Sequence, residues 1–393
     1  MDQTGNKKPV HYKTNIDSEI DFTIDEANIK KDTDSMKRSR KTTKLHLLKT
    51  KKGKMILLVV VIVVIGLVIY FAQSGNTKKT ANIADLRTKT VPKSDLVPST
   101  LTGVPVSPSL NKIPVTGVMV ENDIAARPQA GLSSAGVVFE ALTEGGISRF
   151  LALYQNTAPN NVGPIRSARP YFVEWDLGFN APYAHVGGSP LALSDITAWG
   201  VKDLNQFYNG NYYHRISSRL APHNVYTSIA DLNQLEQSKG YTSYNFQGFP
   251  RQKADPAKKP TVTNINMALS YGAYNVSYSY DSQTNSYNRS QGGVPMIDAN
   301  NNQQISPNVV IAIVVPETQG PLDASNAYYS DYHVIGSGNA YVFQDGRVYQ
   351  GQWSKTSRNA QMTFTSNNGQ ILRLDPGQTW ITALTTSSQL TYN

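Results

Sequence analysis

Residues 136–155 read GVVFEALTEGGISRFLALYQ, and the organisation of the folded part of the chain follows from this stretch. Two apolar runs, 136–142 and 149–155, each have the length of a strand, and the polar TEGGIS lies between them. Short apolar runs bounded by turn residues are typical of buried strands. We therefore expect two strands of one sheet here, joined by a short loop.

The sequence around these runs alternates predicted strands with predicted helices, namely strands at 115–122 and 183–188 and helices at 170–179, 189–199 and 226–240. Ser189 precedes a proline, which is the usual start of a helix, and Thr227 or Ser228 is placed to cap the last helix. Ser167 or a neighbour is expected to cap the helix at 170–179. Residues 113–250 therefore predict an α/β-type domain.

The remainder of the sequence carries almost only strand signals. Residues 274–281 alternate polar and apolar side chains, and 306–316 form a continuous apolar run. Asp345-Gly346 and Asn368-Gly369 are each flanked by strand-forming residues, which indicates two hairpins. Residues 258–393 thus predict a mainly β second domain, and the fold class of the whole chain is α+β.

A third signal lies upstream of both domains. Residues 55–72 read MILLVVVIVVIGLVIYFA and carry no charge, and as a helix they would span about 27 Å, close to the thickness of a bilayer core. A cleaved signal peptide would place a shorter apolar region near residue 10. The strongly basic flank at 37–54 predicts a single transmembrane helix with a cytoplasmic amino terminus. Residues 1–54 are then a disordered basic tail, and 73–112 an extended linker.

The composition excludes several classes of function. Of the net charge of +9, the tail contributes 14 Lys and Arg against 8 Asp and Glu, so the remainder is nearly balanced and predicts no nucleic-acid partner. The chain has no cysteine, which excludes disulfides, thiolate metal sites and a cysteine nucleophile. No metal or dinucleotide motif occurs, so we predict no metal site and no cofactor.

Carboxylates in glycine-rich loops are candidates for catalysis. Cleavage of a glycosidic bond needs a protonated carboxylic acid near the sugar, often with a second carboxylate. Glu144, beside Gly145-Gly146, is the favoured general acid, and Glu121, Asp123 and Glu140 are the alternatives. The alternative is that these four carboxylates have no catalytic role and are solvated or form internal salt bridges.

The sequence supports an anion-binding site more strongly than a catalytic one, because arginines and other polar residues cluster in its loops. GPIRSARP places two arginines beside a helix start, and HVGGSP joins a strand to a second helix start. Planar guanidinium groups and the free N–H groups of a helix start bind carboxylate or phosphate. The predicted ligand-binding residues are Arg127, Arg149, Arg166, Arg169, His185, Ser189, Arg219, His223 and Asn224. Internal pairing of the arginines with Glu121, Glu140 or Glu144 is the alternative.

These motifs carry a family resemblance. GVMVEND, ARPQAGLSSAGVVFEALTEGGISRFLALYQ, VGPIRSARPYFVEWDLGFNAPYAHVGGSP and LAPHNVYTS, with the closing LDPGQTWI, resemble the YerB family over roughly residues 113–386. The resemblance implies a bacterial envelope protein, mainly of Gram-positive species, with paired domains of unknown function. It supplies no catalytic residues. Many members are lipoproteins, whereas this chain lacks the cysteine that would carry the lipid.

Together these features predict a protein of the cell membrane whose bulk faces outward and binds peptidoglycan, teichoic acid or another anionic wall polymer. A peptidoglycan-cleaving enzyme with a carboxylate acid is the first alternative. A scaffold for wall-synthesis or division proteins, with the cytoplasmic tail as the docking arm for a protein partner, is the second. The expected partners are therefore the wall polymer and the membrane.

Overall fold

The computed structural model describes residues 83–88, 91–322 and 328–393, all within one compact unit that begins at Ala81. The predicted tail at 1–54 and the predicted transmembrane helix at 55–72 lie outside the described residues. In the described part of the chain, no helix has the length and apolar character needed to cross a bilayer. The helix at 55–72 stays a prediction from the sequence.

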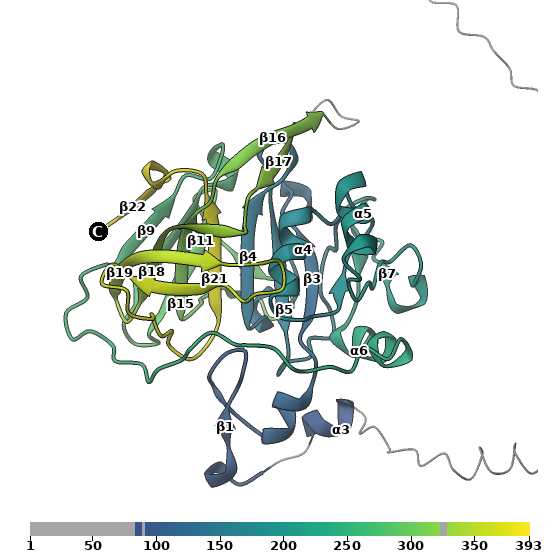
Figure 1. Ribbon diagram of the computed structural model, residues 1–393, viewed down its shortest axis with the longest axis horizontal. Coiled ribbons are helices and arrows are strands. Elements are labelled where there is room, and N and C mark those ends of the chain that lie inside the picture. The colour runs from purple at the N-terminus through teal and green to yellow at the C-terminus, as the bar shows by residue number, and fades with distance from the viewer. Residues whose placement is uncertain (1–82, 89–90, 323–327) are drawn as a thin grey trace, which may run out of the picture. The chain divides into compact units, whose positions relative to one another are not determined.

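A nine-stranded mixed sheet runs through the centre of the unit (Figure 1). In spatial order its strands are β20 (Thr363–Ser366), β19 (Arg347–Lys355), β18 (Gly336–Gln344), β15 (Val309–Val314), β21 (Thr379–Leu384), β4 (Val137–Leu142), β5 (Ser148–Tyr154), β3 (Thr116–Glu121) and β6 (Tyr183–Ala184). The two strands predicted from residues 136–155 are β4 and β5, and they pair antiparallel.

Strand β21 joins the two halves of the sequence. It lies between β15 and β4 and runs parallel to both, so that Ile381 is opposite Ile311 on one side and Phe139 on the other. The segments 113–250 and 258–393, which the sequence separates by a polar bridge, therefore contribute to one continuous sheet.

A five-stranded antiparallel sheet and four helices complete the main architecture. The sheet consists of β12 (Val294–Pro295), β11 (Ser286–Gln291), β10 (Val276–Asp281), β9 (Asn264–Met267) and β22 (Leu390–Tyr392). The helices are α3 (Ile83–Thr88), α4 (Pro170–Leu177), α5 (Pro190–Ala198) and α6 (Ile229–Ser238). The α+β composition predicted from the sequence is confirmed, with strands predominating.

Four two-stranded ribbons lie at the margins. They are β1 (Val97–Pro98) with β2 (Pro105–Val106), β7 (His214–Arg215) with β8 (Val225–Tyr226), β13 (Ile297–Asp298) with β14 (Gln303–Gln304), and β16 (Glu317–Leu322) with β17 (Tyr328–Tyr332). Figure 1 shows β16 and β17 projecting from one end of the molecule.

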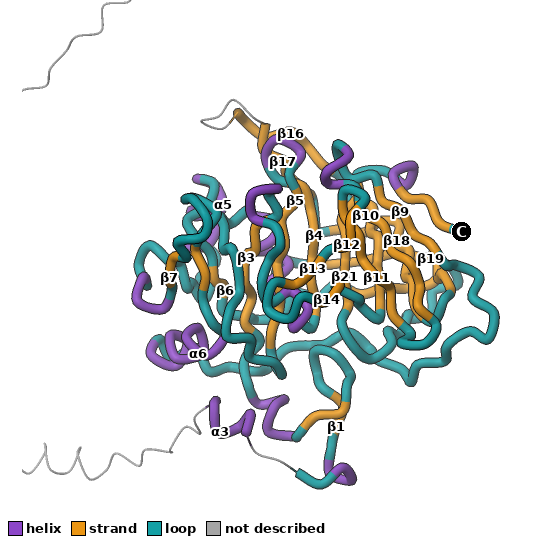
Figure 2. The backbone as a smooth tube through the Cα atoms, turned by 180° about the vertical axis from the view of Figure 1, so that it is seen from behind, coloured by secondary structure: helices purple, strands orange, loops and turns teal. Residues whose placement is uncertain are grey.

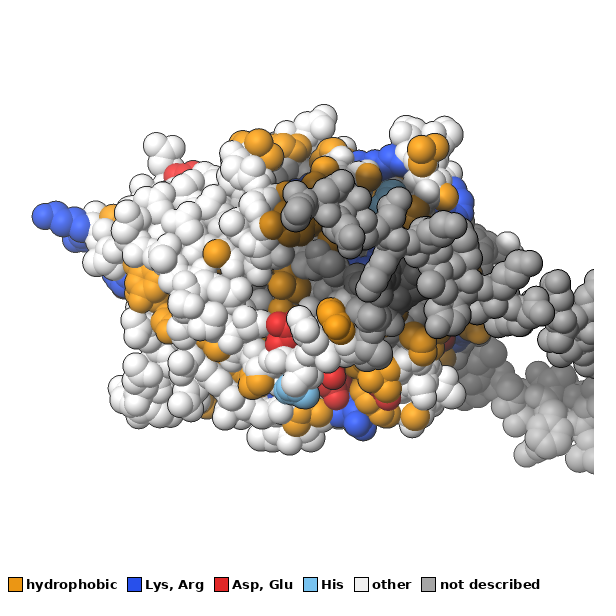
Figure 3. All heavy atoms as spheres, turned by 90° about the horizontal axis from the view of Figure 1, so that it is seen from above, with side chains coloured by type: hydrophobic (Ala, Val, Ile, Leu, Met, Phe, Trp, Pro, Cys, Tyr) orange, Lys and Arg blue, Asp and Glu red, His pale blue; other side chains and the backbone are white. Residues whose placement is uncertain are grey.

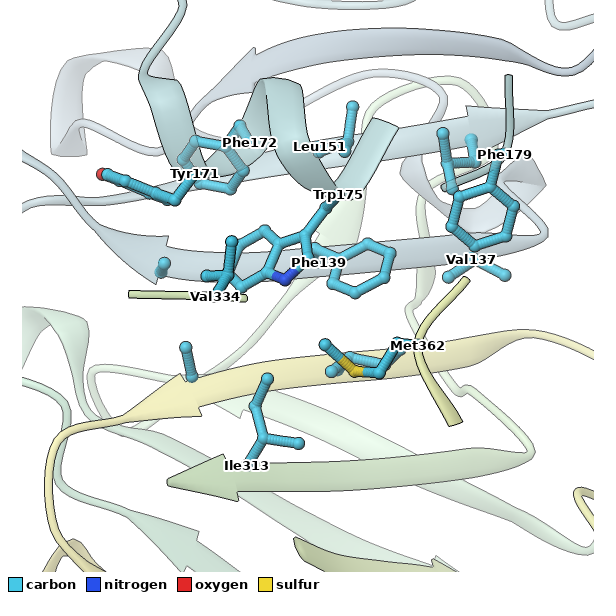
Figure 4. Packing of buried hydrophobic residues seen from close by; sticks show 14 of the residues in the cluster. Val137, Phe139, Leu151, Tyr171, Phe172, Trp175, Phe179, Ile313, Val334 and Met362 are labelled. Atoms are coloured by element: carbon cyan, nitrogen blue, oxygen red, sulfur yellow. The ribbon is translucent and has the colours of Figure 1, made fainter. Parts of the chain in front are cut away.

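Both faces of the central sheet are buried. On one face, Phe139 and Leu151 pack with Trp175 of α4, whose indole stacks on the Phe139 ring at 4.9 Å between centroids (Figure 4). On the other face, Val138 and Phe150 belong to a second cluster that includes α6 and the five-stranded sheet. Burial on both faces explains why these strands read as continuous apolar runs.

Local signals in the sequence are confirmed at several helix starts and turns. The Ser189 hydroxyl accepts a hydrogen bond from Ala192 N at the start of α5, and Ser228 does the same for Asp231 N at the start of α6. Asp345 and Gly346 both have positive φ and connect β18 to β19. The cap of α4 differs from the prediction, because Arg169 occupies that position without a side-chain capping bond.

The predicted extended linker at 73–112 is wrong for its described part. Residues 97–106 form the β1–β2 ribbon, which lies beside α3 (Figure 2). Leu101 at the turn of this ribbon is 1% exposed, and Arg251 donates a 2.6 Å hydrogen bond to its carbonyl oxygen. Apolar residues among the prolines, threonines and serines give this segment enough buried surface to fold onto the body of the protein.

Charged side chains are sparse on the surface. Seen from above, the molecule shows mostly uncharged side chains with charges scattered singly or in small groups (Figure 3). This agrees with the low charged fraction of 17% in the sequence. The clustered charges are found instead at the buried ends of the central strands.

Candidate functional site

Three segments converge at one end of strands β3 and β5. Glu121, the last residue of β3, is opposite Arg149 near the start of β5. The segment 163–169 runs alongside, because Arg166 N donates to Met119 O at 3.0 Å and Ile165 N donates to Val225 O at 2.7 Å. Sheet pairing therefore brings together residues from four motifs of the sequence.

Glu121 is the centre of one ion network. Its carboxylate is 2.8 Å from Arg166 Nε and 3.0 Å from His223 Nδ1. The Glu121 side chain is almost fully buried, whereas Arg166 and His223 are about one quarter exposed. The second carboxylate oxygen, Oε2, is buried without a hydrogen-bond partner among the described residues.

Glu144 is the centre of a second network next to the first. It lies in a single 3-10 turn, Glu144–Gly146, in which both glycines have positive φ. Its carboxylate forms an ion pair with Arg169 and lies 3.7 Å from Arg149 Nη2. Arg149 also donates to Ser167 O at 2.7 Å, and the Arg169 guanidinium lies 5.3 Å from the centre of the Tyr329 ring.

These residues form one unit, which we call the arginine cluster: Arg149, Arg166, Arg169, Glu121, Glu144 and His223. Three guanidinium groups face two carboxylates. Burial, together with the nearby Arg169 guanidinium, lowers the pKa of Arg149 to about 10. Arg149 Nε, moreover, has no hydrogen-bond partner among the described residues. The cluster therefore holds more positive than negative charge in a largely desolvated place.

Glu140 lies apart from this cluster. Its side chain is fully buried and accepts hydrogen bonds from Arg289 Nη2 at 2.9 and 3.0 Å. Ser148, Trp380 and Thr382 also donate to it, at 2.9, 3.1 and 3.3 Å. The Arg289 guanidinium in turn lies 4.3 Å from the centre of the Trp380 ring. This buried pair links β4 to the second half of the chain and has a structural role.

Arg127 and Arg219 brace the loop that follows β3. Arg127 donates to Asn122 O at 3.1 Å and to Ala273 O at 2.9 Å. Arg219 donates to Ala126 O and, at 2.7 Å, to Pro128 O. Their guanidinium groups thus hold backbone carbonyls in place, and the predicted binding of an anion by Arg127 and Arg219 stays a prediction.

The other predicted residues serve local structure. Asp123 accepts from Ala125 N and caps the turn Ile124–Ala126, and Asn224 donates to the carbonyls of Ile216 and Arg219. His185 is fully buried, with Nε2 2.9 Å from Asp203 and Nδ1 2.6 Å from Gly187 O. Ser189 caps α5. His185 and Ser189 therefore belong to the packing of the strand-to-helix connection.

The carboxylates predicted as general acids all have partners in the structure. Glu144, the favoured candidate, is bound by Arg169 and lies next to Arg149. Glu121 and Glu140 are likewise paired with arginine, and Asp123 is a cap. Within residues 83–88, 91–322 and 328–393, no three His, Asp or Glu side chains are grouped as a metal site would require.

Comparison with known proteins places the chain in a family. Residues 101–242 and 265–381 match the models for the N-terminal and C-terminal domains of a protein of unknown function, DUF3048. The "Putative lipoprotein YerB" of Bacillus subtilis strain 168 is 31% identical over 307 residues, which cover 74% of this chain and 88% of YerB. The chain belongs to the YerB family.

A solved structure agrees with this assignment. The crystal structure of YerB from Bacillus subtilis superposes with a TM-score of 0.68 at 28% identity, covering 76% of this chain and 99% of YerB. Both YerB-family domains contribute strands to the central sheet, because β4 lies within the first matched segment and β15 within the second, and β21, which begins in the second, pairs with both strands. The family resemblance read from the sequence is confirmed.

The sequence did not reveal Arg289 as a partner of Glu140. Arg289 lies 149 residues further along the chain, in a stretch rich in serine and asparagine, and no local pattern connects the two. In this YerB-family chain the pair forms only because β11 and β21 pack across β4. The one local hint is an arginine on an otherwise uncharged β-strand, where an unpaired cation would be costly.

Proposed function

We propose that this YerB-family protein is held in the cell membrane by the helix predicted at 55–72 and binds an anionic polymer of the cell wall through the arginine cluster. Carboxylates of peptidoglycan stems and phosphates of teichoic acid offer the same chemistry to a guanidinium group. The observation that carries the proposal is the surplus of arginine over carboxylate in the cluster, where Arg149 is held among cations.

Location supports the same proposal. The relative from Bacillus subtilis is named as a lipoprotein, which describes a protein attached to a membrane by lipid. This chain contains no cysteine but has 18 consecutive uncharged residues behind a basic flank. A transmembrane helix in place of the lipid would keep the domain at the same surface.

The binding proposal is tested by sedimentation of the full-length protein, in detergent, with purified cell walls. Arg166→Ala combined with Arg169→Ala should weaken binding about thirtyfold, because two charge-assisted contacts of about 1 kcal/mol each are lost. The matched control is Arg347→Ala with Arg373→Ala, which removes the same charge from sites outside the cluster. Equal sedimentation of the two double variants would contradict the proposal.

Walls stripped of teichoic acid distinguish the two sources of anion. Binding that survives the stripping assigns the carboxylates of peptidoglycan, and binding that is lost assigns the phosphates. Analysis of the supernatant by mass spectrometry checks the enzymatic alternative, since release of soluble wall fragments that Glu144→Gln abolishes would replace the binding proposal with a catalytic one.

A further inference from the structure

A second site is a cleft of about 470 Å³. It lies beside the end of β5, whereas Arg149 of the arginine cluster lies near the start of that strand. Five segments line the cleft: the turn of the β1–β2 ribbon, residues 133–136 before β4, residues 155–157 after β5, residues 301–308 around β14, and residues 377–378 before β21. A volume of this size is ordinary for a small-molecule site. The cleft shares no lining residue with the arginine cluster.

The polar groups of the cleft are uncharged. Amide and hydroxyl side chains lie beside a few aliphatic ones, and no charged or aromatic residue occurs among the described residues that form it. The amides are those of Gln155, Asn156, Asn301, Gln303, Gln304, Asn308 and Gln378. Each primary amide offers both a donor and an acceptor, which matches the paired donor and acceptor character of sugar hydroxyls and acetamido groups.

Two buried polar atoms of the lining lack partners. Gln155 is 1% exposed and Thr102 is 9% exposed, yet Gln155 Oε1 and Thr102 Oγ1 form no hydrogen bond with any described residue. Both atoms belong to residues that line the cleft, but they lie beneath its surface, so a ligand would contact the exposed amides of the lining instead.

The rest of the lining is held in place before any ligand binds. Gln378 Nε2 donates to the carbonyls of Leu132 and Ala135, both at 2.8 Å, and Asn308 Oδ1 accepts from Gln378 N at 3.2 Å. The carboxylate of Asp298 accepts from Gly131 N and Ser133 N at 3.0 and 2.7 Å and so ties the β13–β14 ribbon to the same wall. Fixed donors and acceptors lower the entropic cost of binding.

We propose that this cleft binds an uncharged oligosaccharide. The lack of charged lining residues disfavours phosphate or carboxylate ligands, and the lack of aromatic or large apolar pockets disfavours peptide side chains as anchors. The proposal does not depend on the arginine cluster. The cleft would bind the neutral part of a polymer, and the arginine cluster, at a separate place, would bind its anionic part.

Occupation of the cleft would also fix the position of the β1–β2 ribbon, residues 97–106. Leu101, Thr102 and Val104, which form one wall, belong to the turn between β1 and β2. A ligand that contacts this turn and the segment at 301–308 holds the ribbon against the body of the protein. Binding should therefore increase the protection of residues 97–106 from hydrogen exchange.

The test is titration calorimetry of the full-length protein in detergent with chitohexaose, an uncharged N-acetylated oligosaccharide. Gln303→Ala, at an exposed lining residue whose side chain forms no hydrogen bond within the described residues, should lower affinity about three- to tenfold without a folding defect. Thr102→Val keeps the shape of the side chain and removes a hydroxyl buried beneath the lining, so we expect folding and affinity to be unchanged. Thr365→Val, outside the cleft, is the matched control and should bind like the wild type.

Hydrogen exchange with and without chitohexaose gives the second readout, with protection expected at 97–106. Hexaalanine is the competing probe. Absence of chitohexaose binding at millimolar concentration, equal affinity of all three variants and wild type, or tighter binding of hexaalanine would each overturn the proposal. Because Arg166→Ala with Arg169→Ala should leave chitohexaose binding unchanged, failure here is distinct from failure of the anion site.

Discussion

Glu140 in β4 and Glu144 just after β4 are both bound by arginine, but the two pairs have different roles. Glu140 and Arg289 are fully buried, and four side chains donate to the carboxylate. Glu144 is 14% exposed and faces two arginines that it cannot both neutralise. A complete network stabilises the fold, whereas an incomplete one leaves charge for a ligand.

The largest effect should come from breaking the complete network. Glu140→Gln leaves Arg289 as a buried cation without a counterion, and removal of one partner of a buried pair costs about 3–5 kcal/mol. Denaturant unfolding of the variant measures the change in the free energy of unfolding. Arg347→Ala, which removes a partly exposed charge, is the control and should cost under about 1 kcal/mol. A loss below 1 kcal/mol for Glu140→Gln would show that the pair is dispensable.

A third carboxyl group, Glu236 in α6, extends the comparison, because it is buried with no direct ion pair. Thr116 and Asn233 donate to it at 2.6 and 3.0 Å, while Arg87, Lys202 and the buried Asp176 act at longer range. Burial raises the pKa of Glu236 from 4.5 to about 8. In the folded state it is therefore protonated at neutral pH, whereas in the unfolded state it is ionised.

The sign of the pH dependence follows from this difference. Between pH 4.5 and 8 the folded state binds one proton more than the unfolded state, so Glu236 makes the free energy of unfolding fall as pH rises, by up to about 1.4 kcal/mol per pH unit. Above pH 8 the contribution becomes constant. Glu236→Gln should flatten this part of the profile of denaturation midpoint against pH. An identical slope in the variant and the wild type would assign the dependence to other groups.

A smaller effect should sharpen the difference between Glu140 and Glu144. Glu144→Gln removes a negative charge from the incomplete network, so the surplus of positive charge grows. Binding of full-length protein to purified walls should strengthen about threefold. The free energy of unfolding should fall by less than in Glu140→Gln, because Glu144 is not fully buried. Sedimentation at two salt concentrations measures the first quantity. Weaker binding by this variant would mean that Glu144 contacts the ligand itself.

Local features of the fold could be predicted from the sequence, and long-range ones could not. The β4 and β5 strands and the serine caps of α5 and α6 depend on neighbouring residues, and all are confirmed. The insertion of β21 beside β4 depends on residues about 240 positions apart, which no periodicity records. The same holds for the β1–β2 ribbon, whose folding depends on contacts with distant residues such as Arg251.

The candidate site shows the same division. Glu121, Glu144, Arg149, Arg166, Arg169 and His223 were selected as polar residues in loops, and they do meet in one place. The sequence could not tell that Arg127 and Arg219 are occupied by backbone carbonyls, because those carbonyls belong to residues on other loops. Nor could it place the amide-lined cleft, whose walls come from five separate segments.

The position of β21 has a consequence for how the protein is made. The strand lies in the middle of the central sheet, yet residues 379–384 are synthesised about 240 residues after β4. Until they arrive, β4 and β15 each present an unpaired edge, which is open to association with other chains. The sheet can therefore close only after β21 has emerged, so removal of residues 379–393 should affect the first domain as severely as the second.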